Sequence, residues 1–156
     1  MPRAALFLLL AFLVSPAFAA AIDFGGFAFD RQPYEAFARS TGMSCHAHAT
    51  TTTCSGAIDI EGMKVPAVAV WRKTRRGERV LAQGTADLGC DTASVQRLVN
   101  AGIKRWGKPA AHVLPARKTL WTWRDAAGNR ATFTDAPDAG RATCTLLVED
   151  GRWARE

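Results

Sequence analysis

Two alternating segments on either side of a glycine turn constrain the fold of this chain more than any other feature. Residues 119–125 and 129–134 alternate apolar with polar side chains, which is the two-residue period of a strand with one buried face. The three-residue connection between them ends in Gly128, and such connections favour a hairpin. The pattern predicts two cross-strand pairs on the core face, Trp123 with Ala131 and Trp121 with Phe133.

A helix is predicted before this hairpin, and a third strand after it. Asp91 has the residue type of a helix N-cap, and Gly107 followed by Pro109 marks the helix end. Residues 142–149 alternate again and predict the third strand. Within the helix the core-facing positions recur at helical spacing, at Val95, Leu98, Val99, Gly102, Ile103 and Trp106.

The N-terminal half follows the same order more loosely. Asp30 is expected to open a helix that ends at Gly42. Residues 65–73 and 78–83 then predict a hairpin around residues 74–77. Trp71-Arg72 precedes this turn, as Trp123-Arg124 precedes the turn at residues 126–128. Both halves therefore share the order of a helix followed by a hairpin.

This order predicts an α+β fold in which a helix is followed by three antiparallel strands, with the helices packed on one sheet face. The order would occur twice in tandem if the chain holds two repeats, at about residues 30–84 and 91–149. Chance recurrence of a common helix-then-hairpin order is the alternative, and the sequence leaves both open.

A family resemblance appears in the second half. After the helix come Trp106-Gly107-Lys108-Pro109, Trp121-Thr122-Trp123-Arg124-Asp125, Gly128 and Phe133. This resembles the helix, G-x-P and Y/W-x-W … G … F pattern of the superfamily that contains β-lactamase inhibitor proteins and BamE-like outer-membrane assembly proteins. The resemblance covers residues 91–149 and implies a small αβ-sheet module, single or tandem, that binds other proteins. The chain lacks the lipid-anchor cysteine of the assembly proteins, and no inhibitory loop residue can be matched.

The first residues have the pattern of an export signal. Met1-Pro2-Arg3 is basic, Ala4 to Val14 is apolar, and Ser15 to Ala21 is mostly small. Residues 1–19 are therefore expected to be a signal peptide, cut after Ala19 or, as the second choice, after Ala21. An apolar run of this length is too short to span a bilayer, and no second run could do so. We expect residues 20–156 to form a single domain, monomeric and either periplasmic or secreted.

The charge balance favours an anionic partner. The chain has a formal net charge of +6, and about +5 remains without the leader. The candidates are an acidic surface of another envelope or secreted protein and an anionic envelope component such as a phosphate-bearing lipid or polysaccharide. Nucleic acid is not expected, because the tryptophans alternate into the core instead of interleaving with basic residues on a surface.

Four cysteines in an exported chain favour two disulfides. Proximity pairs Cys45 with Cys54, which would enclose a stapled loop or a threonine-rich hairpin. Cys90 would then pair with Cys144 and tie the second helix to the last strand.

Metal binding is the alternative for the same segment. Cys45, His46, His48 and Cys54 together have the ligand types for zinc or copper. Their spacing departs from standard sites, because adjacent Cys-His residues point to opposite sides of an extended chain. No cofactor is therefore expected, and this set is kept as the alternative.

The sequence offers little for catalysis. It has no nucleophile elbow, zinc-protease helix or phosphate-binding glycine loop, and His112 stands alone in a connector. Asp59 and Glu61 have the spacing of two carboxylates on one strand face, which could serve acid–base chemistry in a small hydrolase. An exposed strand edge explains them equally, and the expected protein is not an enzyme.

The arginines are the candidate binding residues. The predicted hairpin registers place Arg124 opposite Arg130 and Arg72 opposite Arg79, on the side away from the core. Facing like charges repel, and an acidic group between them would relieve the repulsion. The turn of the first hairpin adds Arg75 and Arg76. A solvated sheet face with splayed arginines is the bland alternative.

The sequence thus predicts an exported, disulfide-linked, non-catalytic binding protein that resembles an inhibitor or an assembly factor. Its partner would be another protein or an anionic envelope component. The alternative is a small metal-binding or hydrolytic envelope protein that uses the segment from Cys45 to Cys54.

Overall fold

The computed structural model describes residues 20–29, 33–89, 91–115, 118–136 and 143–153. The predicted leader, residues 1–19, lies outside them. None of the described helices is both long and apolar enough to cross a membrane. The elements run along the chain in the order β1 (Asp23–Phe24), β2 (Phe27–Ala28), α1 (Tyr34–Thr41), β3 (Ser44–Ala47), β4 (Thr51–Ile60), β5 (Met63–Lys73), β6 (Arg79–Leu88), α2 (Thr92–Trp106), β7 (Ala110–Val113), β8 (Thr119–Arg124), β9 (Arg130–Ala136) and β10 (Thr143–Glu149).

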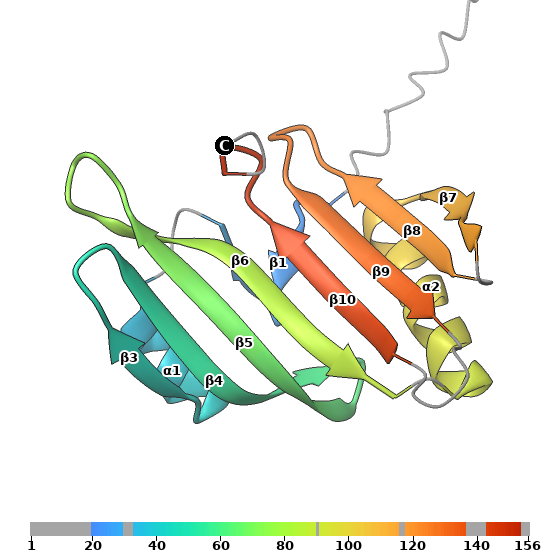
Figure 1. The fold of residues 1–156 in the computed structure, drawn as a ribbon, viewed down its shortest axis with the longest axis horizontal. Coiled ribbons are helices and arrows are strands. Elements are labelled where there is room, and N and C mark those ends of the chain that lie inside the picture. The colour runs from blue at the N-terminus through green and yellow to red at the C-terminus, as the bar shows by residue number, and fades with distance from the viewer. Residues whose placement is uncertain (1–19, 30–32, 90, 116–117, 137–142, 154–156) are drawn as a thin grey trace, which may run out of the picture.

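Eight of these strands form one sheet, in which every neighbouring pair is antiparallel. The order across the sheet is β3-β4-β5-β6-β10-β9-β8-β7, and β1 and β2 form a separate two-stranded hairpin. Figure 1 shows both helices and β1 behind the sheet, with α1 on the side of β3 and β4 and α2 on the side of β8. The face toward the viewer carries no helix. We call this uncovered surface the open face.

The predicted α+β fold, with a helix followed by three antiparallel strands, is wrong. The described part of the chain is mostly β, and each helix is followed by four strands that all join the same sheet. The strands that the prediction missed lie in segments without a clear alternation of apolar and polar residues. β4 begins in a run of threonines, whose β-branched side chains favour a strand once neighbours pair on both sides. β7 is a short, exposed edge strand.

The two halves of the chain meet at the centre of the sheet. β6 ends the first run of four strands, β10 ends the second, and these two strands pair along their length from Leu88 with Cys144 to Gln83 with Glu149. Each half therefore contributes one side of the sheet. Duplication of a repeat stays a prediction, since the arrangement of strands alone does not establish a common sequence origin.

The second helix forms as its end signals predict. Asp91 is the N-cap, and its side chain accepts a hydrogen bond from the Ser94 backbone N at 2.9 Å. Hydrogen bonds from the side chain and backbone of Ser94 hold the pKa of the Asp91 carboxyl below its ordinary value. Gly107 closes α2 with a positive φ. In the first half, α1 begins at Tyr34, whereas the predicted start at Asp30 lies outside the described residues.

The core lies between the sheet and the helical layer. The predicted pairs Trp123 with Ala131 and Trp121 with Phe133 are both present in the β8–β9 register. Of these four side chains, all but Trp121 are buried, and Trp121 packs against the core. In the other half, Trp71 is fully buried and meets the Phe37 ring edge-on with centroids 5.0 Å apart. The helical stripe is buried at Leu98, Val99 and Gly102, while Ile103 is 43% exposed.

Candidate binding face

The open face has a central row of short, uncharged side chains. Strand registers place one residue from each of six neighbouring strands side by side, because residues opposite one another in a sheet point to the same face. All six are small polar or aliphatic residues, and Val68 is 41% exposed. From β4 to β8 the row reads Ser55, Val68, Thr85, Leu147, Thr132 and Thr122.

A charged row runs beside the central row on β10, β9 and β8. Arg124 lies opposite Arg130, as predicted, and Arg130 lies opposite Glu149. Arg130 donates from Nε to the Glu149 carboxylate at 2.9 Å, and its Nη2 completes the ion pair. The acidic group expected to relieve the arginine repulsion is therefore supplied by the chain itself. Arg124 is exposed and makes no hydrogen bond or ion pair with any described residue.

Replacing Glu149 by glutamine should lower the free energy of unfolding by about 1 kcal/mol. Arg130 would keep an uncharged acceptor but lose the carboxylate that offsets its repulsion with Arg124. Adding Arg124→Gln to the same chain should restore most of the loss, because one of the two like charges is then gone. Urea unfolding of the single and double variants measures the coupling. Equal loss in both variants would contradict the charge argument.

The predicted pair of Arg72 with Arg79 is wrong. The register of β5 with β6 shifts between Val70 and Trp71, so Arg72 lies opposite Val80 and Lys73 lies opposite Arg79. This bulge adds one residue on β6, which hairpin spacing alone does not reveal.

Arg79 also points away from the open face. It donates from Nη1 to the buried Thr52 Oγ1 at 2.5 Å and from Nη2 to the His48 carbonyl oxygen at 2.6 Å. A guanidinium held by these acceptors stabilises the end of the sheet, so the structure favours a local structural role for Arg79. Arg75 and Arg76 are exposed at the turn between β5 and β6 and form no ion pair with a described residue.

The C-terminal turn adds an aromatic residue that the sequence reading missed. The Arg72 guanidinium lies 5.2 Å from the centre of the Trp153 ring, in a cation–π contact. Arg72 belongs to the open face through its place opposite Thr51 and Val80. The signal that the sequence offered for this contact was a tryptophan four residues beyond the last strand. Tryptophan and arginine are the residue types most often found at the energetic centres of interfaces.

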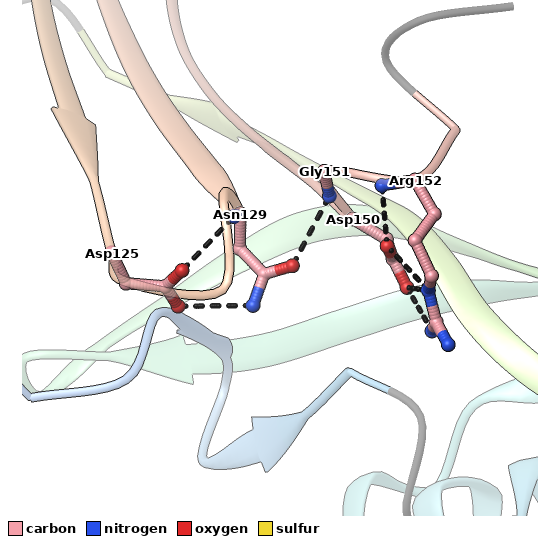
Figure 2. Close-up of polar contacts among 5 residues, drawn as sticks. All are labelled: Asp125, Asn129, Asp150, Gly151 and Arg152. Carbon is pink, nitrogen blue, oxygen red and sulfur yellow. Dashed lines mark hydrogen bonds and ion pairs between the residues drawn. The ribbon is translucent and has the colours of Figure 1, made fainter.

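Hydrogen bonds fix this turn against the rest of the molecule (Figure 2). The buried Asp150 carboxylate accepts from Arg152. Outside this view, the Asp150 backbone N donates to the Ala82 carbonyl oxygen at 2.9 Å. Asn129 Oδ1 accepts from the Gly151 backbone N at 3.1 Å, and the Asn129 side chain donates to Asp125. The turn between β8 and β9 and the C-terminal turn therefore form one network, which holds Trp153 near the edge of the open face.

The Cys45 to Cys54 segment is a disulfide-linked hairpin. The two residues lie opposite each other in β3 and β4, and their sulfurs are bonded. Bonded sulfurs are not thiolate ligands, and His46 and His48 are both exposed. Across the residues that the structure describes, no three His, Cys, Asp or Glu side chains gather as a metal site would require. Cys144 is also disulfide-bonded, and its predicted partner Cys90 lies outside the described residues.

The structure does not bring His112 close to the candidate carboxylates Asp59 and Glu61. Asp59 Oδ1 accepts from the Gly62 backbone N at 2.9 Å and so caps the turn between β4 and β5. Glu61 is exposed in this turn, with a φ of 52°. His112 is exposed on the edge strand β7, at the far end of the sheet from β4. The turn geometry explains Asp59 without any catalytic role.

The geometry defines a class of protein: a single antiparallel sheet with one helical layer and one uncovered face. Comparison with protein-family models, with curated proteins and with solved structures finds no match for this chain.

Proposed function

We propose that this chain is an exported, non-catalytic binding protein whose open face binds another envelope or secreted protein. The observation that carries the proposal is the uncovered face of the eight-stranded sheet. A sheet normally packs one face on the core, and the other face either meets water or a partner. The leader-like first residues and the Cys45–Cys54 disulfide support export, because disulfides persist in oxidising compartments.

The area of the open face is near the lower end of the range found for specific protein interfaces. Eight strands about 4.8 Å apart span roughly 34 Å, and five residues along a strand span roughly 17 Å. The product, roughly 600 Å², approaches the roughly 800 Å² that each partner contributes to a standard protein interface.

The chemistry of the open face favours a protein over an anionic polymer or lipid. Its central row is uncharged, with Val68 and Leu147 among threonines, and the charges lie beside it. Protein interfaces have this arrangement of a less charged centre and a polar rim. An anionic polymer or lipid would favour clustered free cations, whereas Glu149 already neutralises Arg130. We expect Arg124, Arg72 and Trp153 to contact the partner beside the uncharged central row.

Site-specific photo-crosslinking in the native host tests this proposal. A photoreactive phenylalanine analogue at Thr85 or Thr132 should give an adduct of one discrete protein mass. The same analogue at Asn100, exposed on α2 behind the sheet, is the matched control and should give none. Adding Arg124→Glu should reduce the adduct at Thr132 several-fold, whereas replacing His46 and His48 by alanine should not change it.

Other outcomes would overturn the proposal. Equal adducts from Thr132 and Asn100 would mean that the open face is not selective. A heterogeneous phosphate-bearing adduct would identify an anionic envelope component as the partner. Loss of the adduct on replacing the two histidines would move the site to the Cys45–Cys54 hairpin.

A further inference from the structure

The Asp125 carboxylate, directly after β8, accepts three hydrogen bonds but has no cation beside it. Asn129 donates to it twice, from its side chain and from its backbone N, each at 2.9 Å. The third donor is the Ile22 backbone N, which lies 3.0 Å from Asp125 Oδ2. Asp125 is half-buried and forms no ion pair with a described residue. A partly desolvated carboxylate that meets only neutral donors would gain from a positive charge at one of them.

Ile22 is the first buried residue of the described chain. Its side chain is 1% exposed, whereas Ala20 and Ala21 are exposed and make no hydrogen bond with a described residue. Figure 2 shows the N-terminal segment, in pale blue, passing beside Asp125. Packing of the chain against the rest of the protein therefore begins at Ile22.

The sequence permits two points of leader removal, because small residues are needed one and three positions before the cut. A cut after Ala19 has Ala17 and Ala19 at these positions, and a cut after Ala21 has Ala19 and Ala21. The two products differ in the group that faces Asp125. The first keeps a neutral amide N–H at Ile22. The second has an α-amino group there, which is protonated at neutral pH because the ordinary pKa of such a group is about 8.

We propose that the leader is removed after Ala21 and that the new α-ammonium group of Ile22 forms an ion pair with Asp125. Water is the co-reactant: hydrolysis breaks the C–N bond between the two residues and leaves a carboxylate on Ala21 and an ammonium on Ile22. The nitrogen already lies at hydrogen-bond distance from Asp125 Oδ2, so the pair forms without a change in the path of the backbone. The inference rests on the proposed export but not on what the open face binds.

The surroundings of Ile22 suit a charged terminus. A half-open hollow of about 400 Å³ is lined by Ile22, Asp125 and Asn129, among others. Water in it can hydrate the ammonium N–H groups that do not face the carboxylate.

The ion pair would connect leader removal to the C-terminal turn. Asn129 donates to Asp125 and accepts from the Gly151 backbone N at 3.1 Å. A charge on the Ile22 nitrogen would hold Asp125 in place, and with it the network that keeps Trp153 near the edge of the open face.

The N-terminus of the protein purified from its native host gives the first test. Intact mass and N-terminal sequencing are expected to show a chain that begins with Ile22. Any other start after the leader, such as Ala20, would overturn the inference and leave the proposed export intact. A chain that keeps residues 1–19 would overturn export as well.

Thermal unfolding of two chains, one beginning with Ile22 and one with Ala20, tests the ion pair. Both are released from a fusion partner, so that each has a free α-amino group. The chain that begins with Ile22 should unfold about 5 °C higher, because a charge-assisted hydrogen bond replaces a neutral one. Equal midpoints would overturn the ion pair.

Two substitutions make the comparison specific to Asp125. Asp125→Asn should reduce the difference between the two starts to less than about 1 °C, even where it destabilises both chains, because only the difference is compared. Asp23→Asn is the matched control. It removes the carboxylate next to Ile22 in the sequence, which already pairs with Arg105 at 3.1 Å, and should leave the difference unchanged. A difference that persists in Asp125→Asn would contradict the assignment.

A second measurement decides the question if Asp125→Asn does not fold. The α-amino group of the chain that begins with Ile22 should react several-fold more slowly with an acylating reagent at neutral pH than that of the chain that begins with Ala20. The reason is that a neighbouring carboxylate favours the protonated, unreactive form. Equal rates would overturn the ion pair.

Discussion

Replacing Gly84 by alanine is expected to lower the free energy of unfolding by about 3 kcal/mol, at the upper end of the usual cost of overpacking. Gly84 lies in β6 at the centre of the sheet, and the fully buried Phe24 ring rests on its backbone. A Cβ at this position would lie 2.4 Å from two ring carbons. The ring has little room to move, because it also stacks on Phe37 with centroids 6.4 Å apart.

Urea unfolding of four chains tests this expectation. Gly89→Ala is the matched control, because a Cβ there would have no neighbour within 4 Å, and its stability should change by less than about 0.5 kcal/mol. Phe24→Leu removes the ring, so adding Gly84→Ala to it should cost about 1 kcal/mol or less. The same large loss with and without the Phe24 ring would contradict the clash. The displaced β1 would also disturb the pocket behind the sheet that Asp23, Gly25 and Gly26 help to line.

Removing the Cys45–Cys54 disulfide should cost about 2.5 kcal/mol. The residues are nine apart, and closing a loop of that size restricts the unfolded chain by about this free energy. The link also holds β3, an edge strand that pairs with β4 alone. Alanine at both positions is the suitable change, because serine would bury a hydroxyl at the fully buried Cys54.

Urea unfolding of the double alanine variant against the oxidised wild type measures this loss. The variant is preferable to chemical reduction of the wild type, because reduction would also break the disulfide at Cys144. We expect hydrogen exchange to accelerate in β3 and the start of β4, with α2 unchanged. Unchanged stability would mean that strand pairing alone holds the hairpin. Zinc or copper retained by the variant would revive the metal alternative at His46 and His48.

The elements that could be predicted from the sequence are those specified by neighbouring residues. α2 follows from its cap, its glycine end and its apolar spacing, and the β8–β9 hairpin follows from alternation around Gly128. The fold class was wrong because the number of strands was not a local property. β4 and β7 form where partners are available, and the pairing of β6 with β10 joins residues about 60 positions apart.

The contacts of the candidate binding residues also fall into two groups, those specified by neighbouring residues and those that depend on distant strands. Arg124 opposite Arg130 depended on one turn and is correct, whereas Arg72 opposite Arg79 failed because a bulge shifts the register. Glu149 and Trp153 could not be placed from the sequence, because each reaches its arginine across a different strand or turn. The pocket behind the sheet unites residues from both halves and has no signature along the chain.

The sequence by itself determined the local signals: the caps and apolar stripe of α2, the facing residues of one hairpin and the pairing of Cys45 with Cys54. These depend on dihedral preferences and on contacts between residues close in the chain. Only the tertiary structure decided that all eight strands share one sheet, that its open face has an uncharged central row, and that a pocket lined by residues from both halves of the chain lies behind it. Those features arise from pairing between distant segments, and strand order and register depend on the packing of the whole domain.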